Sequence, residues 1–254
     1  MKNIFTAIAL IFFIGTFAQT TADEILDNYF ENTGGKANWE KLEGFKMSGL
    51  ASGQGMEIPI EVLQLKDGRQ YVKISIQGKE LMQGVYDGEV LWNTNFMTQK
   101  AEAMTTEQVE NFKLNQLKDF PTPFLNYKEK GYKVELLGEE TMEGAECYKI
   151  KLTQNPVKVD GVEEESVSFY YFDKENFVPI VAENEIKSGP MKGKMMKATM
   201  SDYEEVEGLY FPMSLSQMGG PFTIEKIEIN PEVDQSVFDM PKEEETPPPT
   251  EEKK

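Results

Sequence analysis

Hydrophobic and polar residues alternate with a period of two along most of this chain, most clearly from Met195 to Ser216. Apolar residues occupy alternate positions from Met196 to Met200 and again from Leu209 to Leu215. This period predicts strands with one buried face, and Glu207-Gly208 between them predicts a tight hairpin turn. Similar short strands recur along the chain, so we expect one curved antiparallel sheet whose apolar face needs a cover.

Two turns and two changes of phase refine this picture. The turns at Lys66–Arg69 and Tyr86–Glu89 both contain Asp-Gly, which predicts hairpins between antiparallel neighbours. The alternation changes phase after Val62 and again between Ile224 and Ile227, and each change predicts a β-bulge. The whole pattern predicts about 11 strands in a mostly β fold with a few helices.

The first predicted helix begins at Thr21, which forms a capping-box pattern with Glu24. An apolar stripe at helical spacing follows, and Gly34-Gly35 ends the helix because glycine adopts left-handed conformations at low cost. A shorter helical turn with Trp39 and Leu42 comes next. We interpret the stripe as core packing against the sheet.

A second helix interrupts the strand pattern between Asn93 and Tyr132. Thr105 and Gln108 form its capping box, and Pro121 and Pro123 end the segment. One broad side of residues 105–120 is apolar, through Val109, Phe112, Leu117 and Phe120. Such a helix would cover the open face of a sheet, either as a static part of the core or as a mobile lid.

The two ends of the chain differ from its middle. Residues 1–18 have a lysine, an apolar run and Thr16-Phe17-Ala18, which together predict a cleaved signal peptide and export to the periplasm. Residues 241–254 are charged and proline-rich, which predicts a disordered tail. Residues 19–240 are left as a single domain, with no permanent membrane insertion expected.

Composition excludes several classes of function. The chain carries a formal net charge of −18, which repels nucleic acid and anionic lipid surfaces. It contains no histidine, so Ser-His-Asp and Cys-His systems and histidine metal ligands are absent. The single cysteine, Cys147, is predicted to be a packed thiol, and the single arginine, Arg69, leaves little scope for phosphate clamps. We expect no metal and no cofactor.

Acidic residues cluster at Glu139-Glu140, Glu163–Glu165 and Glu204-Glu205. Adjacent residues on a strand point to opposite faces, so neighbours do not share one site. We interpret these clusters as solvated surface. A hydrolase with paired carboxylates remains an alternative, because such pairs have no fixed sequence spacing.

The chain has 14 methionines, many of them at predicted strand positions. Methionine suits surfaces that accept varied apolar partners, although it also fills gaps in ordinary cores. By alternation, the expected lining of an apolar cavity is Met47, Met82, Trp92, Met200 and Phe211. The apolar side of the second helix would close that cavity.

Several motifs together resemble the LolA/LolB-like outer-membrane lipoprotein-sorting proteins. They include Phe45–Gly49, Tyr86-Asp87-Gly88 with Trp92, and, most specifically, Asp202–Gly208 leading into Phe211-Pro212. The resemblance covers roughly residues 22–241 and implies an unclosed antiparallel β-barrel of about 11 strands covered by a helical lid. It also implies a cavity that holds acyl chains, including those of lipoproteins.

The resemblance has one departure. In the family, an arginine inside the cavity latches the lid, whereas Arg69 lies beside a hairpin turn. The leading hypothesis is a non-enzymatic periplasmic carrier for acyl chains or lipoproteins. The alternative is an envelope protein-interaction module, with protein partners, whose core is filled.

Overall fold

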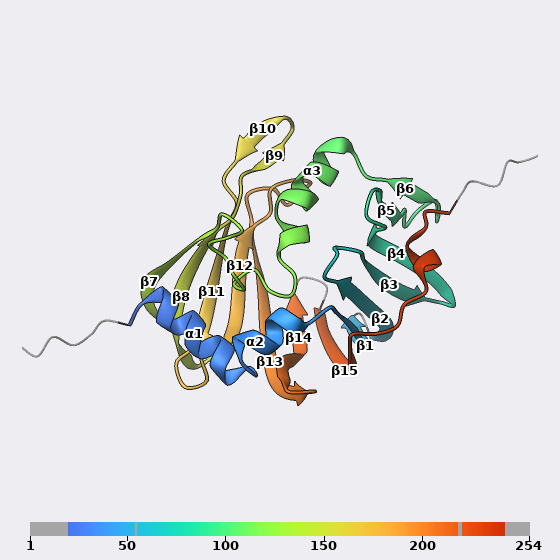
Figure 1. Ribbon diagram of the computed structural model, residues 1–254. Coiled ribbons are helices and arrows are strands. Elements are labelled where there is room, and N and C mark those ends of the chain that lie inside the picture. The colour runs from blue at the N-terminus through green and yellow to red at the C-terminus, as the bar shows by residue number, and fades with distance from the viewer. Residues whose placement is uncertain (1–19, 54, 218–219, 242–254) are drawn as a thin grey trace, which may run out of the picture.

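Thirteen strands form one antiparallel sheet, and a two-stranded hairpin projects from it (Figure 1). The computed structural model describes residues 20–53, 55–217 and 220–241. The order across the sheet is β6-β5-β4-β3-β2-β1-β15-β14-β13-β12-β11-β8-β7, and β9 pairs with β10. The first six strands are β1 (Gly44–Gly53), β2 (Met56–Leu65), β3 (Gln70–Ile76), β4 (Lys79–Tyr86), β5 (Leu91–Thr94) and β6 (Ala101–Ala103). The others are β7 (Lys133–Met142), β8 (Ala145–Thr153), β9 (Val157–Val159), β10 (Val162–Glu164), β11 (Val167–Asp173), β12 (Pro179–Glu185), β13 (Met195–Val206), β14 (Leu209–Gln217) and β15 (Gly220–Ile229).

The sheet consists of two wings that meet where β1 pairs with β15. One wing holds β1–β6 and the other holds β7, β8 and β11–β15, and Figure 1 shows them on either side of α3. The free edges are β6 and β7, which follow one another in the sequence but lie at opposite ends of the sheet. The chain between them, residues 104–132, must therefore cross the open side of the sheet, and we call it the crossing segment.

Three α-helices lie on one face of the sheet, which we call the inner face. They are α1 (Ala22–Asn32), α2 (Lys36–Lys41) and α3 (Thr106–Leu114), and short 3₁₀ turns follow at η1 (Gln116–Lys118) and η2 (Gln235–Phe238). Thr21 and Thr105 cap α1 and α3 in capping boxes, which confirms both predictions. Figure 1 shows α3 between the two wings, as the crossing connection requires.

The largest core lies on the inner face of the second wing. Tyr29 of α1 and Phe124 of the crossing segment both contact Phe172 of β11, with ring centroids 5.8 and 5.3 Å apart. Phe172 is fully buried. These edge-on aromatic contacts fill the concave side of this wing, so α1 is core packing as the sequence predicted.

The opposite, outer face of the first wing carries a second core. Leu63, Tyr71 and Trp92 pack there with Phe238 of η2, which is 1% exposed. The Trp92 indole Nε1 donates a hydrogen bond to the Phe238 carbonyl at 2.9 Å. The C-terminal segment thus covers the outer face of β2–β5.

This second core explains why one predicted bulge is wrong. The β1–β2 register runs without a shift from Gly44↔Leu65 to Gly53↔Met56. The apparent phase change at Leu63 arises because β2 buries side chains on both faces. The other predicted bulge is confirmed, because the β1–β15 register shifts between Ser48 and Gly49, opposite the Ile224–Ile227 segment.

The three predicted hairpin turns and the predicted burial of the Cys147 thiol are confirmed. Val206 pairs with Leu209 across Glu207-Gly208, and the two Asp-Gly turns join β2 to β3 and β4 to β5. Cys147 is fully buried on the outer face with Tyr171 and Val181. The sequence did not predict β6 or the β9–β10 hairpin, because strands of three residues contain too few positions to show a period.

The predicted signal peptide, residues 1–18, lies outside the described residues, and so does the predicted tail apart from Pro241. Among the helices that the structure describes, none combines the length and apolar character needed to span a bilayer.

We predict that Phe238→Ala lowers the free energy of unfolding by about 3–5 kcal/mol, because it opens a cavity in the outer core. Urea unfolding followed by circular dichroism measures the loss. Trp92 emission should also shift to the red in the folded variant. The control is Phe96→Ala, at a side chain that is 55% exposed, with an expected change within about 0.5 kcal/mol. Equal effects of the two substitutions would contradict the assignment.

Candidate functional site

The inner face of the first wing carries an apolar surface that the main core leaves half-buried. Cross-strand pairing places Met47, Val62 and Val72 side by side, and Ile60 beside Ile74. Directly opposed residues share one face of a sheet, so these rows continue the face on which Met47 meets the core. We call this surface the inner apolar face, defined by Met47, Ala51, Ile58, Ile60, Val62, Val72, Ile74, Met200, Leu215 and Phe222, all of them half-buried.

The same rows extend into the second wing. Met200 pairs with Leu215, which pairs with Phe222, and Phe222 pairs with Ala51 of β1. Met47, Leu215 and Phe222 border the main core. The surface is therefore continuous across the seam between the wings.

Of the five predicted lining residues, two belong to this surface. They are Met47 and Met200. Phe211 lies at its deep end, 3% exposed, with its ring centroid 5.2 Å from Trp39 of α2. Met82 and Trp92 lie on the outer face in the second core, where the C-terminal segment covers them. Alternation gives the period but not the face, so the sequence could not separate these two groups.

The apolar side of α3 contacts the wall of the first wing. Phe112 packs against Leu91 and the ring of Tyr86, with centroids 4.9 Å apart, and Val109 and Leu117 pack beside it. Phe120 stacks on Phe45, with centroids 5.8 Å apart and an interplanar angle of 14°. The four predicted covering residues thus lie along one line of contact with the inner face.

The opposite side of α3 is held by polar side chains that the sequence analysis missed. Asn111 donates to the Lys158 carbonyl at 2.7 Å and accepts from the Lys158 N–H at 2.8 Å. Asn115 binds Asn155 in the same way, at 2.9 and 3.1 Å. Glu107, one turn earlier, accepts from the backbone N–H groups of residues 160 and 161. We call Glu107, Asn111 and Asn115 the clamp.

The spacing of the clamp was readable in the sequence. Its members are four residues apart, so they share one side of a helix. Their partners are main-chain groups of the segment around β9 and β10, which carry no sequence signal. The clamp binds the crossing segment to the β9–β10 region, which connects β8 and β11 of the second wing, whereas Phe112 packs it against the first wing.

A pocket of 460 Å³ lies beneath α3, and polar and apolar side chains both line it, the apolar ones being Leu91, Met104, Phe112 and Val157. It includes Gln116, Ser168 and Tyr170 around the carboxyl group of Asp119. Asp119 accepts hydrogen bonds from the Tyr132 hydroxyl at 2.9 Å and from Gln154 Nε2 at 3.0 Å. Burial nevertheless raises the pKa of Asp119 above its usual value. The space directly under the helix is therefore mixed in character, with the carboxyl group of Asp119 beside apolar side chains.

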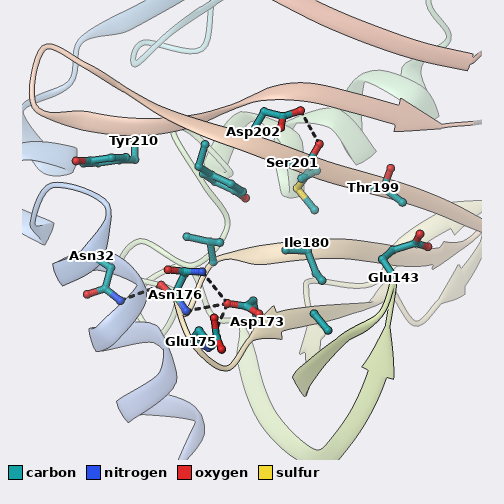
Figure 2. Close-up of a pocket in the computed structure, with 14 residues that line it drawn as sticks. Asn32, Glu143, Asp173, Glu175, Asn176, Ile180, Thr199, Ser201, Asp202 and Tyr210 are labelled. Atoms are coloured by element: carbon teal, nitrogen blue, oxygen red, sulfur yellow. Dashed lines mark hydrogen bonds between the residues drawn. The ribbon is translucent and has the colours of Figure 1, made fainter.

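Another pocket, of 980 Å³, opens where β12 and β13 diverge, and Met200 is one of its lining residues (Figure 2). Figure 2 shows Glu143 and Asp202 lying apart from Asp173 and Glu175 around its rim. Asp173 accepts from the Asn176 N–H at 2.8 Å and so caps its own turn. Glu143 pairs with Lys197, and Asp202 accepts from the Ser201 hydroxyl. These carboxylates are structural caps and surface pairs.

The described part of the chain contains no cluster of three or more His, Cys, Asp or Glu residues able to hold a metal ion. The acidic clusters predicted as solvated surface lie at exposed or half-buried positions, which confirms that interpretation. Arg69 pairs with Asp67 at 2.6 Å and lies over the Phe238 ring on the outer face. Its guanidinium group is therefore directed away from the inner face, where a lid latch would have to lie.

Because Asp119 keeps its proton to higher pH in the folded state than in the unfolded state, its ionisation destabilises the fold as pH rises from about 4. We predict that Asp119→Asn becomes progressively more stable relative to the wild type between pH 4 and pH 7. Each pKa unit corresponds to about 1.4 kcal/mol. Urea unfolding of both proteins across this range measures the difference, and a difference that stays constant or shrinks would contradict the prediction.

Comparison with known proteins gives the fold a context. No protein-family profile matches the chain, and no curated protein matches its sequence. A solved DUF1329 family protein from Desulfovibrio piger is similar over 86% of this chain and 97% of its own, with 14% identity and a TM-score of 0.50. A solved LolA superfamily protein from Nitrosomonas europaea is similar over 87% of this chain and 98% of its own, with 15% identity and a TM-score of 0.51. The chain therefore has the fold of a LolA superfamily protein, an unclosed antiparallel sheet with helices on its inner face.

Proposed function

We propose that this protein is a non-enzymatic binding or carrier protein for acyl chains, those of lipids or of lipoproteins. The observation that carries the proposal is the inner apolar face, a continuous row of half-buried aliphatic and methionine side chains on the concave side of an open sheet. Contiguous apolar surface of this kind marks a ligand or partner site in a soluble protein. The LolA superfamily fold supports the same proposal.

The free energy of binding in this proposal comes from the burial of the ligand's hydrocarbon chain. An alkyl chain laid along Ile60, Val62 and Val72 would gain about 0.8 kcal/mol for each CH₂ group removed from water. Met47 and Met200 border this row with flexible side chains that adjust to different chains. The affinity for a ligand would thus depend more on the length of its alkyl chain than on the other chemical groups of the ligand.

Entry of a chain requires α3 to move, and that movement breaks the hydrogen bonds of the clamp and exposes Phe112. Phe112 is the one residue of α3 that is fully buried, so opening exposes little apolar surface. The clamp consists of hydrogen bonds, which water replaces at a net cost of about 1 kcal/mol each. The crossing segment serves as the lid in this proposal, and the wings serve as a fixed frame.

A protein-interaction module is the second candidate, and one observation favours it. Aromatic rings of α1 and the crossing segment fill the inner face of the second wing, so half of the concave side is solid. On this reading the inner apolar face receives an apolar segment of an envelope protein. The predicted signal peptide supports a periplasmic location under either candidate.

We predict that Val62→Glu weakens acyl-chain binding about tenfold or more, because it places a carboxylate among apolar neighbours where a chain would lie. Displacement of a fluorescent fatty acid from the purified protein measures the affinity. Leu137→Glu is the matched control, since Leu137 is 51% exposed on the edge strand β7. Wild-type protein that takes up no fatty acid, neutral lipid or lipopeptide would remove the carrier proposal.

We predict that Asn111→Ala combined with Asn115→Ala loosens α3, because the pair loses four hydrogen bonds to residues 155 and 158. Hydrogen exchange of residues 106–118 should quicken several-fold, and association of the fluorescent fatty acid should quicken with it. Glu110→Gln is the control, since it removes an exposed ion pair with Lys158 from the same helix. Unchanged exchange in the double variant would show that the clamp does not hold the lid.

A further inference from the structure

A second pocket, of 540 Å³, lies at the other end of the crossing segment, between α2 and residues 118–130. Its walls are apolar and come from Trp39, Leu42, Phe120, Pro121 and Leu125. Its rim carries Lys66, Lys118 and Lys130. Glu40 and Glu129 also line the pocket, so its charged side chains are three lysines and two glutamates.

The charges at this pocket are only partly neutralised. Lys66 Nζ is 2.6 Å from the Glu43 carboxylate and is therefore paired. Lys130 Nζ donates to the Thr122 carbonyl at 2.8 Å, and neither Lys130 nor Lys118 forms an ion pair with any described carboxylate. The two acidic side chains on the rim are Glu40, whose Oε1 accepts from Asn126, and Glu129.

Burial lowers the pKa of Lys130 to about 8, partly offset by the charge of Asp119. A half-buried ammonium group without a carboxylate partner is poorly stabilised. An anion entering the pocket would supply the missing charge. This direction agrees with the geometry of the rim, where no carboxylate of the described residues lies within ion-pair distance of the Lys118 or Lys130 ammonium group.

The pocket is also adjacent to the inner apolar face, with two packed aromatic rings between them. Phe120 forms part of its wall and stacks on Phe45. Phe45 lies on β1 on the same face as Met47, the first member of the inner apolar face. A ligand with a charged head and an apolar chain could thus contact lysines at one end and the strands at the other.

We propose that this pocket holds the anionic head of a single-chain amphiphile, a carboxylate or a phosphate, against Lys118 and Lys130, while the alkyl chain runs past Phe120 toward the inner apolar face. The inference rests on the acyl-chain function proposed above and adds a ligand class to it. Charge-assisted hydrogen bonds to an oxyanion fix the orientation of the head, whereas the strands contribute affinity without direction.

The test uses the full chain and three probes with the same alkyl chain: palmitate, palmitoyl lysophosphatidate and monopalmitoylglycerol. Calorimetric titration should show the anionic probes bound about tenfold or more tightly than the neutral one, a difference that the Lys118→Gln/Lys130→Gln variant should abolish. Binding of the neutral probe should be unchanged in that variant. Comparison of the two anionic probes identifies carboxylate or phosphate as the preferred head.

Lys133→Gln is the matched control, because Lys133 is exposed on β7 and lies outside this pocket. Lys118→Gln alone serves if the double variant folds poorly, since Lys118 is exposed. Equal affinity of the wild type for all three probes, or anion binding unaffected by the lysine substitutions, would overturn this inference and leave the carrier proposal intact. Failure of all three probes to bind would remove both.

Discussion

The position of the two free edges of the sheet is the constraint on which the rest of the structure depends. β6 and β7 are consecutive in the chain, but the pairing of β1 with β15 sets them at opposite ends of a bent sheet. The residues between them therefore cross the open side, and they bring α3, Asp119 and Phe120 over the inner face. A covering helix is thus a consequence of strand order.

The two wings use their faces differently, and this difference separates stability from function. In the second wing the inner face is packed with the rings of Tyr29, Phe124 and Phe172. In the first wing the outer face is packed, by Phe238, and the inner apolar face remains half-buried. Because the first wing is stabilised from behind, its inner face does not need a full apolar cover for the strands to stay folded. That face is the one on which we propose that an acyl chain lies.

Polar contacts hold the helical part of the crossing segment, whereas Phe124 anchors its later part in the main core. The clamp residues bind main-chain groups, and Asp119 joins Tyr132 and Gln154 beneath η1. Hydrogen bonds of this kind fix geometry at a small net free energy, since water satisfies the same groups when they separate. These hydrogen bonds fix the position of the helix. At the far end of the segment, Phe120 lies in the wall of the lysine-rimmed pocket and stacks on Phe45 of the inner face. A displacement of Phe120 would therefore change both the wall of that pocket and the contact with Phe45.

The sequence by itself determined the longer strands, the hairpin at Glu207-Gly208, both capping boxes and the apolar side of the crossing helix, because each depends on residues close together in the chain. Only the tertiary structure decided which face each strand turns to the helices. It placed Met47 on the inner apolar face and Trp92 on the outer face, although both lie in alternating strands. It also showed that the phase change at Leu63 marks a second core and not a bulge. These outcomes depend on contacts with Phe238, more than a hundred residues away, and on the pairing of β1 with β15, which local periodicity does not encode.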